Sequence, residues 1–257
     1  MGKLSILAFV ALCAIGLASR RLELVWEDQF DGEDLGRNYK FDRAAATAGL
    51  VESGAVRQPF IHLHENGNLL QFYLRKIRNS CPFPKGSISG PLFWMMPQDS
   101  EYGPWPRSGE LDIMEYRGQR PTNVLGTIHF GESKENKGQA GSPETTFPMD
   151  FSQDFHVHAV DWSPTKIMWM VDGKVYHEET LERNFWPSVY NSNGQPYDKA
   201  FHMIINLAVG GMFFGGEPFD PIEAMVGQNQ LMKLIGLGNG NGAKFKIIFE
   251  KYVPMLP

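Results

Sequence analysis

Three acidic residues lie within six positions of one another in this chain, at Glu110, Asp112 and Glu115. Two neighbouring carboxyl groups can cleave a glycosidic bond, because one protonates the leaving oxygen and the other attacks the sugar or activates water. The retaining route needs the two groups about 5–5.5 Å apart, with a nucleophile of low pKa and an acid of raised pKa. Asp112 beside Glu110, with Glu115 farther along, could supply that difference in pKa. The cluster therefore predicts a catalytic site for glycoside cleavage.

The segment that carries these acids reads as a β-strand, and a regular strand would not bring all three to one face. Residues i and i+2 share a face, so Glu110 and Asp112 point one way and Glu115 the other. A β-bulge at Ile113-Met114 adds one residue and returns Glu115 to the face of Glu110. The alternative is an edge strand whose acids only face water. Crowded carboxylates raise one another's pKa and destabilise a fold, which favours the catalytic interpretation.

Strand signals dominate the elements that must position this cluster. Alternation over His156–Trp162 and the apolar run Phe201–Val209 predict two strands. Asp172-Gly173 and Asn66-Gly67 each predict the turn of a β-hairpin. The one moderate helix candidate is 221–237. Many short strands between Gly, Pro and Asn turns predict an all-β sandwich or barrel.

The N-terminal segment has the layout of a secretory signal peptide. A short basic start leads into an apolar run, and the small residues Gly16 and Ala18 precede Ser19. We expect residues 1–18 to be removed and residues 19–257 to form a single domain, secreted to the extracellular space. An uncleaved signal anchor is the alternative. No later stretch is apolar enough to cross a bilayer, so we expect a soluble protein without a membrane partner. We also expect a monomer.

The charge and the cysteines restrict the partners further. A formal net charge of −5 without a basic stripe argues against nucleic acid. Of the two cysteines, only Cys81 remains after the signal segment, so no internal disulfide can form. The pairs His62-x-His64 and His156-x-His158 each place two rings on one strand face, where they could grip a metal. Hydrogen-bonded strand histidines are the alternative that we favour, and we predict neither a metal nor a cofactor.

The segment 110–115, Glu-Leu-Asp-Ile-Met-Glu, resembles the signature of glycoside hydrolase family 16 in the bulged form typical of β-1,3-glucanases (laminarinases). The resemblance extends over 84–211, about half of the chain. Further segments agree with the family pattern in the expected order: Pro91–Pro97, Tyr102–Gly109, Gly126–His129, Phe155–Gly173 and Asn206–Gly211.

The resemblance implies a fold and a reaction. The fold would be a jelly-roll β-sandwich of two curved antiparallel sheets, with a concave face that binds the glycan. The chain would be a retaining endo-β-1,3-glucanase acting on laminarin-type β-glucan by double displacement. Glu110 would be the nucleophile and Glu115 the general acid/base, with Asp112 orienting and tuning them.

The resemblance also implies substrate-binding residues around the acids. Trp105 and Arg107 would line the glycone side, and His129 would lie close to the acid/base and the leaving group. Trp94 and Asn206 complete the expected set.

Some positions depart from the family pattern. Ile88 and Gly90 stand where tryptophans are common, and Phe213 or Phe214 replaces another. Ile248 stands where a strand aspartate often binds calcium. The lost aromatic residues leave open an alternative, a β-1,3-glucan or lipopolysaccharide recognition protein of invertebrate innate immunity with little or no activity. The three retained acids favour the enzyme, and release of reducing sugar separates the two functions.

Overall fold

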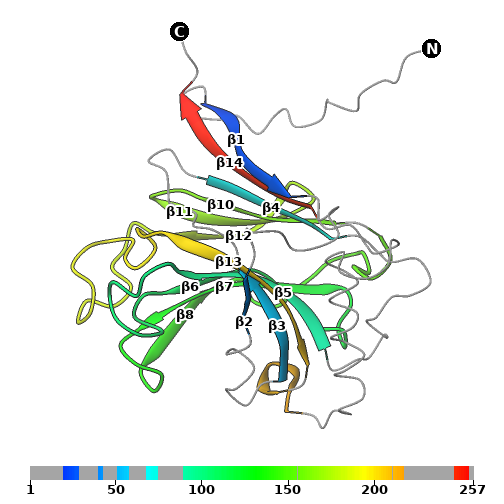
Figure 1. Cartoon of the computed structure of the whole chain (residues 1–257), viewed down its shortest axis with the longest axis horizontal. Coiled ribbons are helices and arrows are strands. Elements are labelled where there is room, and N and C mark those ends of the chain that lie inside the picture. Colours follow the sequence, from blue (N-terminus) through cyan, green and yellow to red (C-terminus); the bar gives the residue numbers. More distant parts are fainter. Residues whose placement is uncertain are drawn as a thin grey trace.

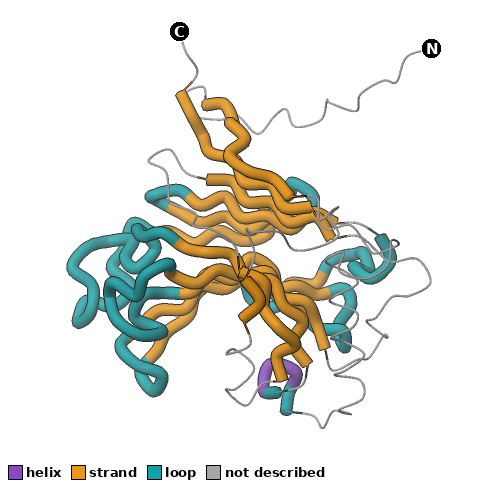
Figure 2. Tube along the Cα trace, in the orientation of Figure 1, coloured by secondary structure: helices purple, strands orange, loops and turns teal. Residues whose placement is uncertain are grey.

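The computed structural model describes residues 20–28, 40–42, 51–57, 68–74, 89–154, 156–209, 211–216 and 246–254. Their strands form two antiparallel sheets, which Figure 1 shows as two stacked layers. The same layers dominate Figure 2, where the helical part of the described chain is a single 3-10 turn, η2 (Met212–Phe214). The predicted all-β jelly-roll sandwich is confirmed.

The first sheet has six strands, and the order of neighbours is β1, β14, β4, β10, β11 and β12. Its strands are β1 (Arg20–Asp28), β4 (Asn68–Leu74), β10 (His156–Trp162), β11 (Lys166–Val171), β12 (Lys174–Thr180) and β14 (Lys246–Pro254).

The second sheet carries the acidic segment on an inner strand, β6. Its order is β2, β3, β13, β5, β6, β7 and β8, and β9 also pairs with β7. Its strands are β2 (Lys40–Asp42), β3 (Val51–Arg57), β5 (Ser89–Pro97), β6 (Glu110–Tyr116), β7 (Asn123–Gly131), β8 (Lys137–Gly141), β9 (Thr145–Thr146) and β13 (Phe201–Val209). Because β6 is paired on both sides, the edge-strand alternative for the acids is wrong.

The core lies between the layers. In the second sheet, the apolar residues Met203, Met95, Leu111 and Ile128 stand side by side on successive strands and are buried. The first sheet contributes large side chains to the same cluster, among them Val160, Trp162, Ile167, Trp169 and Val171. With one face of β6 committed to this core, the polar residues of β6 must use the other face.

The predicted hairpin at Asp172-Gly173 is confirmed. The two residues join β11 to β12 and have φ angles of 50° and 76°, which a two-residue type I′ turn requires. The strands predicted at His156–Trp162 and Phe201–Val209 are also confirmed, as β10 and β13.

Several predictions fall outside the described residues. They concern the signal segment 1–18, the Asn66-Gly67 turn, the pair His62-x-His64, Cys81 and the helix candidate 221–237. In the part of the chain that the structure describes, no helix is long and apolar enough to span a membrane.

Candidate active site

The predicted β-bulge is present in β6. Against β7, Asp112 pairs with Thr127 and Glu115 pairs with Leu125, so Ile113 and Met114 together stand opposite the single residue Gly126. Against β5, Trp94 pairs with Asp112 and Phe93 with Met114, so the register shifts at Ile113. The bulge at Ile113-Met114 is therefore confirmed.

The bulge brings the three acids to one face of the sheet. Leu111, Ile113 and Met114 are buried in the core between the sheets. On the opposite face, Thr127 pairs with Asp112 and donates a hydrogen bond of 2.7 Å from its Oγ1 to Oε2 of Glu115. One side chain of β7 thus stands beside Asp112 and binds Glu115, which a regular strand would not allow. We call Glu110, Asp112 and Glu115 the carboxyl row.

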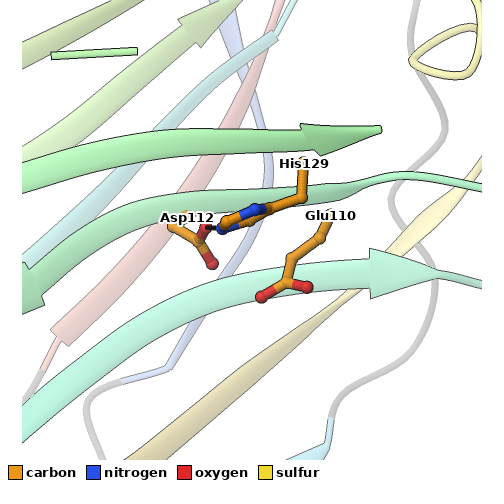
Figure 3. A group of neighbouring side chains, drawn as sticks. All are labelled: Glu110, Asp112 and His129. Atoms are coloured by element: carbon orange, nitrogen blue, oxygen red, sulfur yellow. Dashed lines mark ion pairs between the residues drawn. The ribbon is translucent and has the colours of Figure 1, made fainter. Parts of the chain in front are cut away.

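A tryptophan and a histidine contact the other end of the row. Trp105 donates from Nε1 to Oε2 of Glu110 at 2.5 Å. His129 pairs with Glu110 across the β6–β7 ladder, and its Nε2 lies 3.2 Å from Oδ2 of Asp112. Figure 3 shows the His129 ring directed at Asp112, with the Glu110 carboxyl group beside them. Asp112 itself is only 2% exposed.

Buried tyrosines fix the elements that hold these partners. The hydroxyl of Tyr190 donates to the carbonyl of Arg107 at 2.9 Å and accepts from the amide of Gly131 at 3.2 Å. The hydroxyl of Tyr197 donates to the carbonyl of His129 at 2.8 Å. The loop that carries Trp105 and the end of β7 are therefore tied to the same core.

Burial dominates the electrostatics of the row. It raises the pKa of Glu110 from 4.5 to about 8, with a further rise from the charge of Asp112, while His129 and the Trp105 N–H oppose it. Burial also raises the pKa of Asp112 well above its usual value, and the charge of Glu115 adds to it. The pKa of Glu115 is raised by burial against the opposing effects of Thr127, His129 and Arg117.

The expected contrast between a nucleophile of low pKa and an acid of raised pKa is therefore wrong for the structure as it stands. Spacing along the strand predicted only the mutual repulsion of the acids. The larger cause is burial, which acts on Glu110 and Glu115 alike. Three acids this close hold at least one proton among them near neutral pH.

One group of side chains has spacing suited to a metal ion. Ligand atoms of Glu110, Asp112 and His129 lie within 4.8 Å of one another, the only such group in the described residues. Two of these side chains contact each other, His129 and Asp112, and the third, Glu110, accepts a hydrogen bond from Trp105. The prediction that the chain uses no metal or cofactor stays a prediction.

The histidine pair on β10 is engaged in other contacts. Nδ1 of His156 lies 2.8 Å from Oδ2 of Asp172, at the hairpin turn. His158 is buried, and burial lowers its pKa to about 4, so this ring is neutral. The contact of His156 supports the hydrogen-bonded alternative for that ring.

The remaining predicted residues are Trp94, Arg107 and Asn206. Trp94 pairs with Asp112 across the β5–β6 ladder, so the two share a face. Arg107 donates from Nε to the carbonyl of Glu132 at 3.1 Å. Asn206 pairs with Leu92, the residue that pairs with Glu115; its side chain lies outside the description.

His129 lies between the acids rather than beside Glu115 alone, and its charge also acts on Glu115. The resemblance implies a place close to the acid/base Glu115, and that part stays a prediction; the structure adds that His129 pairs with Glu110 and that its ring lies against Asp112. The register of the β6–β7 ladder decides this position.

Three contributors to this region were not predicted from the sequence. Thr127 holds Glu115, and it could have been found because residues 127 and 129 share a face of one strand. The Lys137 ammonium lies 4.7 Å from the Trp105 ring centroid, a contact between separate loops and strands that spacing does not reveal. Trp169 donates to the Asp112 carbonyl from the other sheet, and no local pattern signals this contact.

The protein consists of two stacked antiparallel sheets with a row of buried carboxyl groups on one face. A β-sandwich with such a row has the residues that a glycoside hydrolase needs. The sequence profile of glycosyl hydrolases family 16 matches residues 85–205. A glucan endo-1,3-beta-glucosidase from Cryptopygus antarcticus is 44% identical over 247 residues, covering 84% of this chain and 90% of the relative. The chain belongs to glycosyl hydrolase family 16.

Two further comparisons agree with this membership. The X-ray structure of an endo-beta-1,3-glucanase from Pyrococcus furiosus superposes with a TM-score of 0.63 at 24% identity, covering 94% of this chain and 98% of that one, which shows the shared fold. A beta-1,3-glucan-binding protein from Penaeus monodon is 30% identical over 167 residues, covering 54% of this chain and 43% of the relative.

Proposed function

We propose that this protein is a secreted endo-β-1,3-glucanase that cleaves laminarin-type β-glucan with retention of configuration. The observation that carries the proposal is the carboxyl row, which the β6 bulge assembles from Glu110, Asp112 and Glu115. The name of the relative from Cryptopygus antarcticus supports the substrate and the internal cleavage. The layout of residues 1–18 supports secretion.

In the proposed reaction, Glu110 attacks the anomeric carbon and forms a glycosyl-enzyme intermediate. Glu115 protonates the leaving oxygen and then, as a base, activates the water that releases the sugar. Burial raises the pKa of Glu115, which favours the protonated form that the first step needs. Its bond from Thr127 orients the carboxyl group and limits that rise.

Glu110 must lose its proton before it attacks, and its surroundings support a route. Carboxyl oxygens of Glu110 and Asp112 lie within 4.8 Å of each other and the two groups influence each other's pKa, so one proton can be shared between them. With that proton on Asp112, the ionised Glu110 keeps the Trp105 N–H and the nearby His129 as stabilising partners. Asp112 would then set the fraction of Glu110 that is ready to attack.

The alternative function, glucan recognition without cleavage, rests on the missing aromatic residues. At Gly90, a Cβ atom would lie 1.7 Å from the carbonyl oxygen of Tyr116, so the backbone leaves no room there for the tryptophan common in the family. The loss of this aromatic side chain is thus part of the local packing. It bears on glucan affinity and leaves the carboxyl row intact.

Hydrolysis decides between the two functions. We expect the purified protein to release reducing sugar from laminarin, and comparison with lichenan tests the linkage. Glu110→Ala should abolish the intermediate, and azide should then give an inverted product from an activated glycoside. Glu115→Ala should still form the intermediate, which azide should resolve with retained configuration. Glu178→Ala, on an exposed surface pair with Lys166, is the control and should keep full activity.

Two outcomes would contradict the proposal. Laminarin binding without any hydrolysis by the wild-type protein would establish the recognition function instead. Full activity in both alanine variants would place the catalytic site elsewhere.

A further inference from the structure

The β6 bulge needs something to hold it, because a strand that slips by one residue turns its side chains to the opposite face. Here a slip would turn Glu115 toward the core and bring an apolar neighbour into the carboxyl row. The pairing with β5 and β7 is shifted at the bulge on both sides. Contacts from outside the second sheet must therefore help to hold the bulge in register.

One such contact comes from the first sheet. Trp169 of β11 is 0% exposed, and its Nε1 donates a buried hydrogen bond of 2.8 Å to the main-chain carbonyl of Asp112. This carbonyl immediately precedes the extra residue of the bulge. The indole crosses the core between the layers and binds the backbone at the point where the register shifts.

The residue opposite the bulge makes room for that indole. A Cβ atom on Gly126 would lie 2.1 Å from Cδ1 and 2.4 Å from Nε1 of Trp169, closer than real atoms approach. Gly126 is also the single residue of β7 that faces Ile113 and Met114. Gly126, the Trp169 indole and the bulge are therefore packed together. A side chain at position 126 would occupy the space of the indole, and the indole binds the backbone of the bulge.

We propose that Trp169, seated over Gly126, is a positioning residue that fixes the β6 bulge and thereby keeps Glu115 in line with Glu110. This inference rests on the proposed function for its kinetic consequence. Trp169 lies on the core side of β6 and acts only through the backbone. Its loss should therefore affect the chemical step rather than the binding of glucan.

The chain offers a matched control. Trp162 is also 0% exposed and belongs to the same core cluster, where its ring meets Phe201 edge-on at 5.5 Å. Its Nε1 has no hydrogen-bond partner among the described residues. Trp162→Phe therefore removes a similar volume of buried indole without touching the bulge.

The kinetic test compares Trp169→Phe with Trp162→Phe on laminarin. Both should lower the melting temperature. Only Trp169→Phe should lower kcat, by about 100-fold if Glu115 is displaced by about 1 Å, with KM unchanged and an altered pH profile of kcat. Should Trp169→Phe fail to fold, Gly126→Ala replaces it, because the added methyl group displaces the indole and should reduce kcat in the same way.

Two results would overturn the inference: equal kinetic losses in both tryptophan variants, or unchanged kcat and pH profile in Trp169→Phe and Gly126→Ala. A readout that needs no turnover separates this failure from failure of the proposed function. In NMR spectra of nitrogen-labelled indoles, the Trp169 N–H proton should resonate downfield of that of Trp162, and Gly126→Ala should move it upfield. If the wild-type protein hydrolyses no glucan, these shifts still decide whether the Trp169 indole binds the Asp112 carbonyl at the bulge.

Discussion

Replacing Glu110 by glutamine should make this protein more stable, even though it removes the proposed nucleophile. Glu110 is held where its ionised form is disfavoured, chiefly by burial and then by the charge of Asp112. Glutamine has the same shape and can still accept the hydrogen bond from Trp105 through its amide oxygen. The substitution therefore removes an unfavourable ionisation and keeps the packing.

The size of the effect follows from the two pKa values of Glu110. The pKa is about 8 in the folded chain against 4.5 for an unperturbed glutamate. Between these values the folded protein holds a proton that the unfolded chain has lost, so wild-type stability falls as the pH rises from about 4.5 to about 8. A tenfold change in proton affinity is worth about 1.4 kcal/mol. Relative to a residue that cannot ionise, Glu110 therefore lowers the free energy of unfolding by about 3 kcal/mol at pH 7 and by under about 1 kcal/mol at pH 5.

Urea unfolding, followed by tryptophan fluorescence at pH 5 and pH 7, measures this difference. Glu110→Gln should raise the free energy of unfolding by up to about 3 kcal/mol at pH 7, or the melting temperature by roughly 6–12 °C, and by much less at pH 5. Glu178→Gln, on the exposed pair with Lys166, changes the charge equally and should alter stability by less than about 0.5 kcal/mol at either pH.

A Glu110→Gln variant that is less stable than wild type at both pH values would contradict this prediction. A difference that does not grow between pH 5 and pH 7 would also contradict it. Either result would mean that the hydrogen bonds and charges around Glu110 outweigh its burial.

Three further predictions concern other parts of the chain. Thr127→Val removes the hydrogen bond that opposes the rise in the pKa of Glu115, so the alkaline limb of the pH profile of kcat/KM should move to higher pH; an unmoved limb would separate Glu115 from the general acid. Mass spectrometry of protein from a eukaryotic host should find a mature chain that begins near Ser19, and intact membrane-bound protein would contradict this. A chelator should change the melting temperature little, because Ile248 cannot ligate calcium; a fall of many degrees would show that the family aspartate was assigned to the wrong position.

Much of the architecture could be predicted because its causes are local. The Asp172-Gly173 turn follows from two residues that tolerate positive φ. The bulge in β6 followed from parity alone: side chains alternate along a strand, so acids at 112 and 115 can share a face only if one residue is added.

The support of the bulge and the charge state of the row could not be predicted in this way. Trp169 and Asp112 are 57 positions apart, and only the stacking of the two sheets brings the indole to that carbonyl. The position of His129 depends on the β6–β7 register, which places it opposite Glu110. The raised pKa of Glu110 comes first from burial, a property of everything packed around the group. Sequence spacing determined which acids meet, whereas only the packing of the two sheets decided what surrounds them and how firmly they hold a proton.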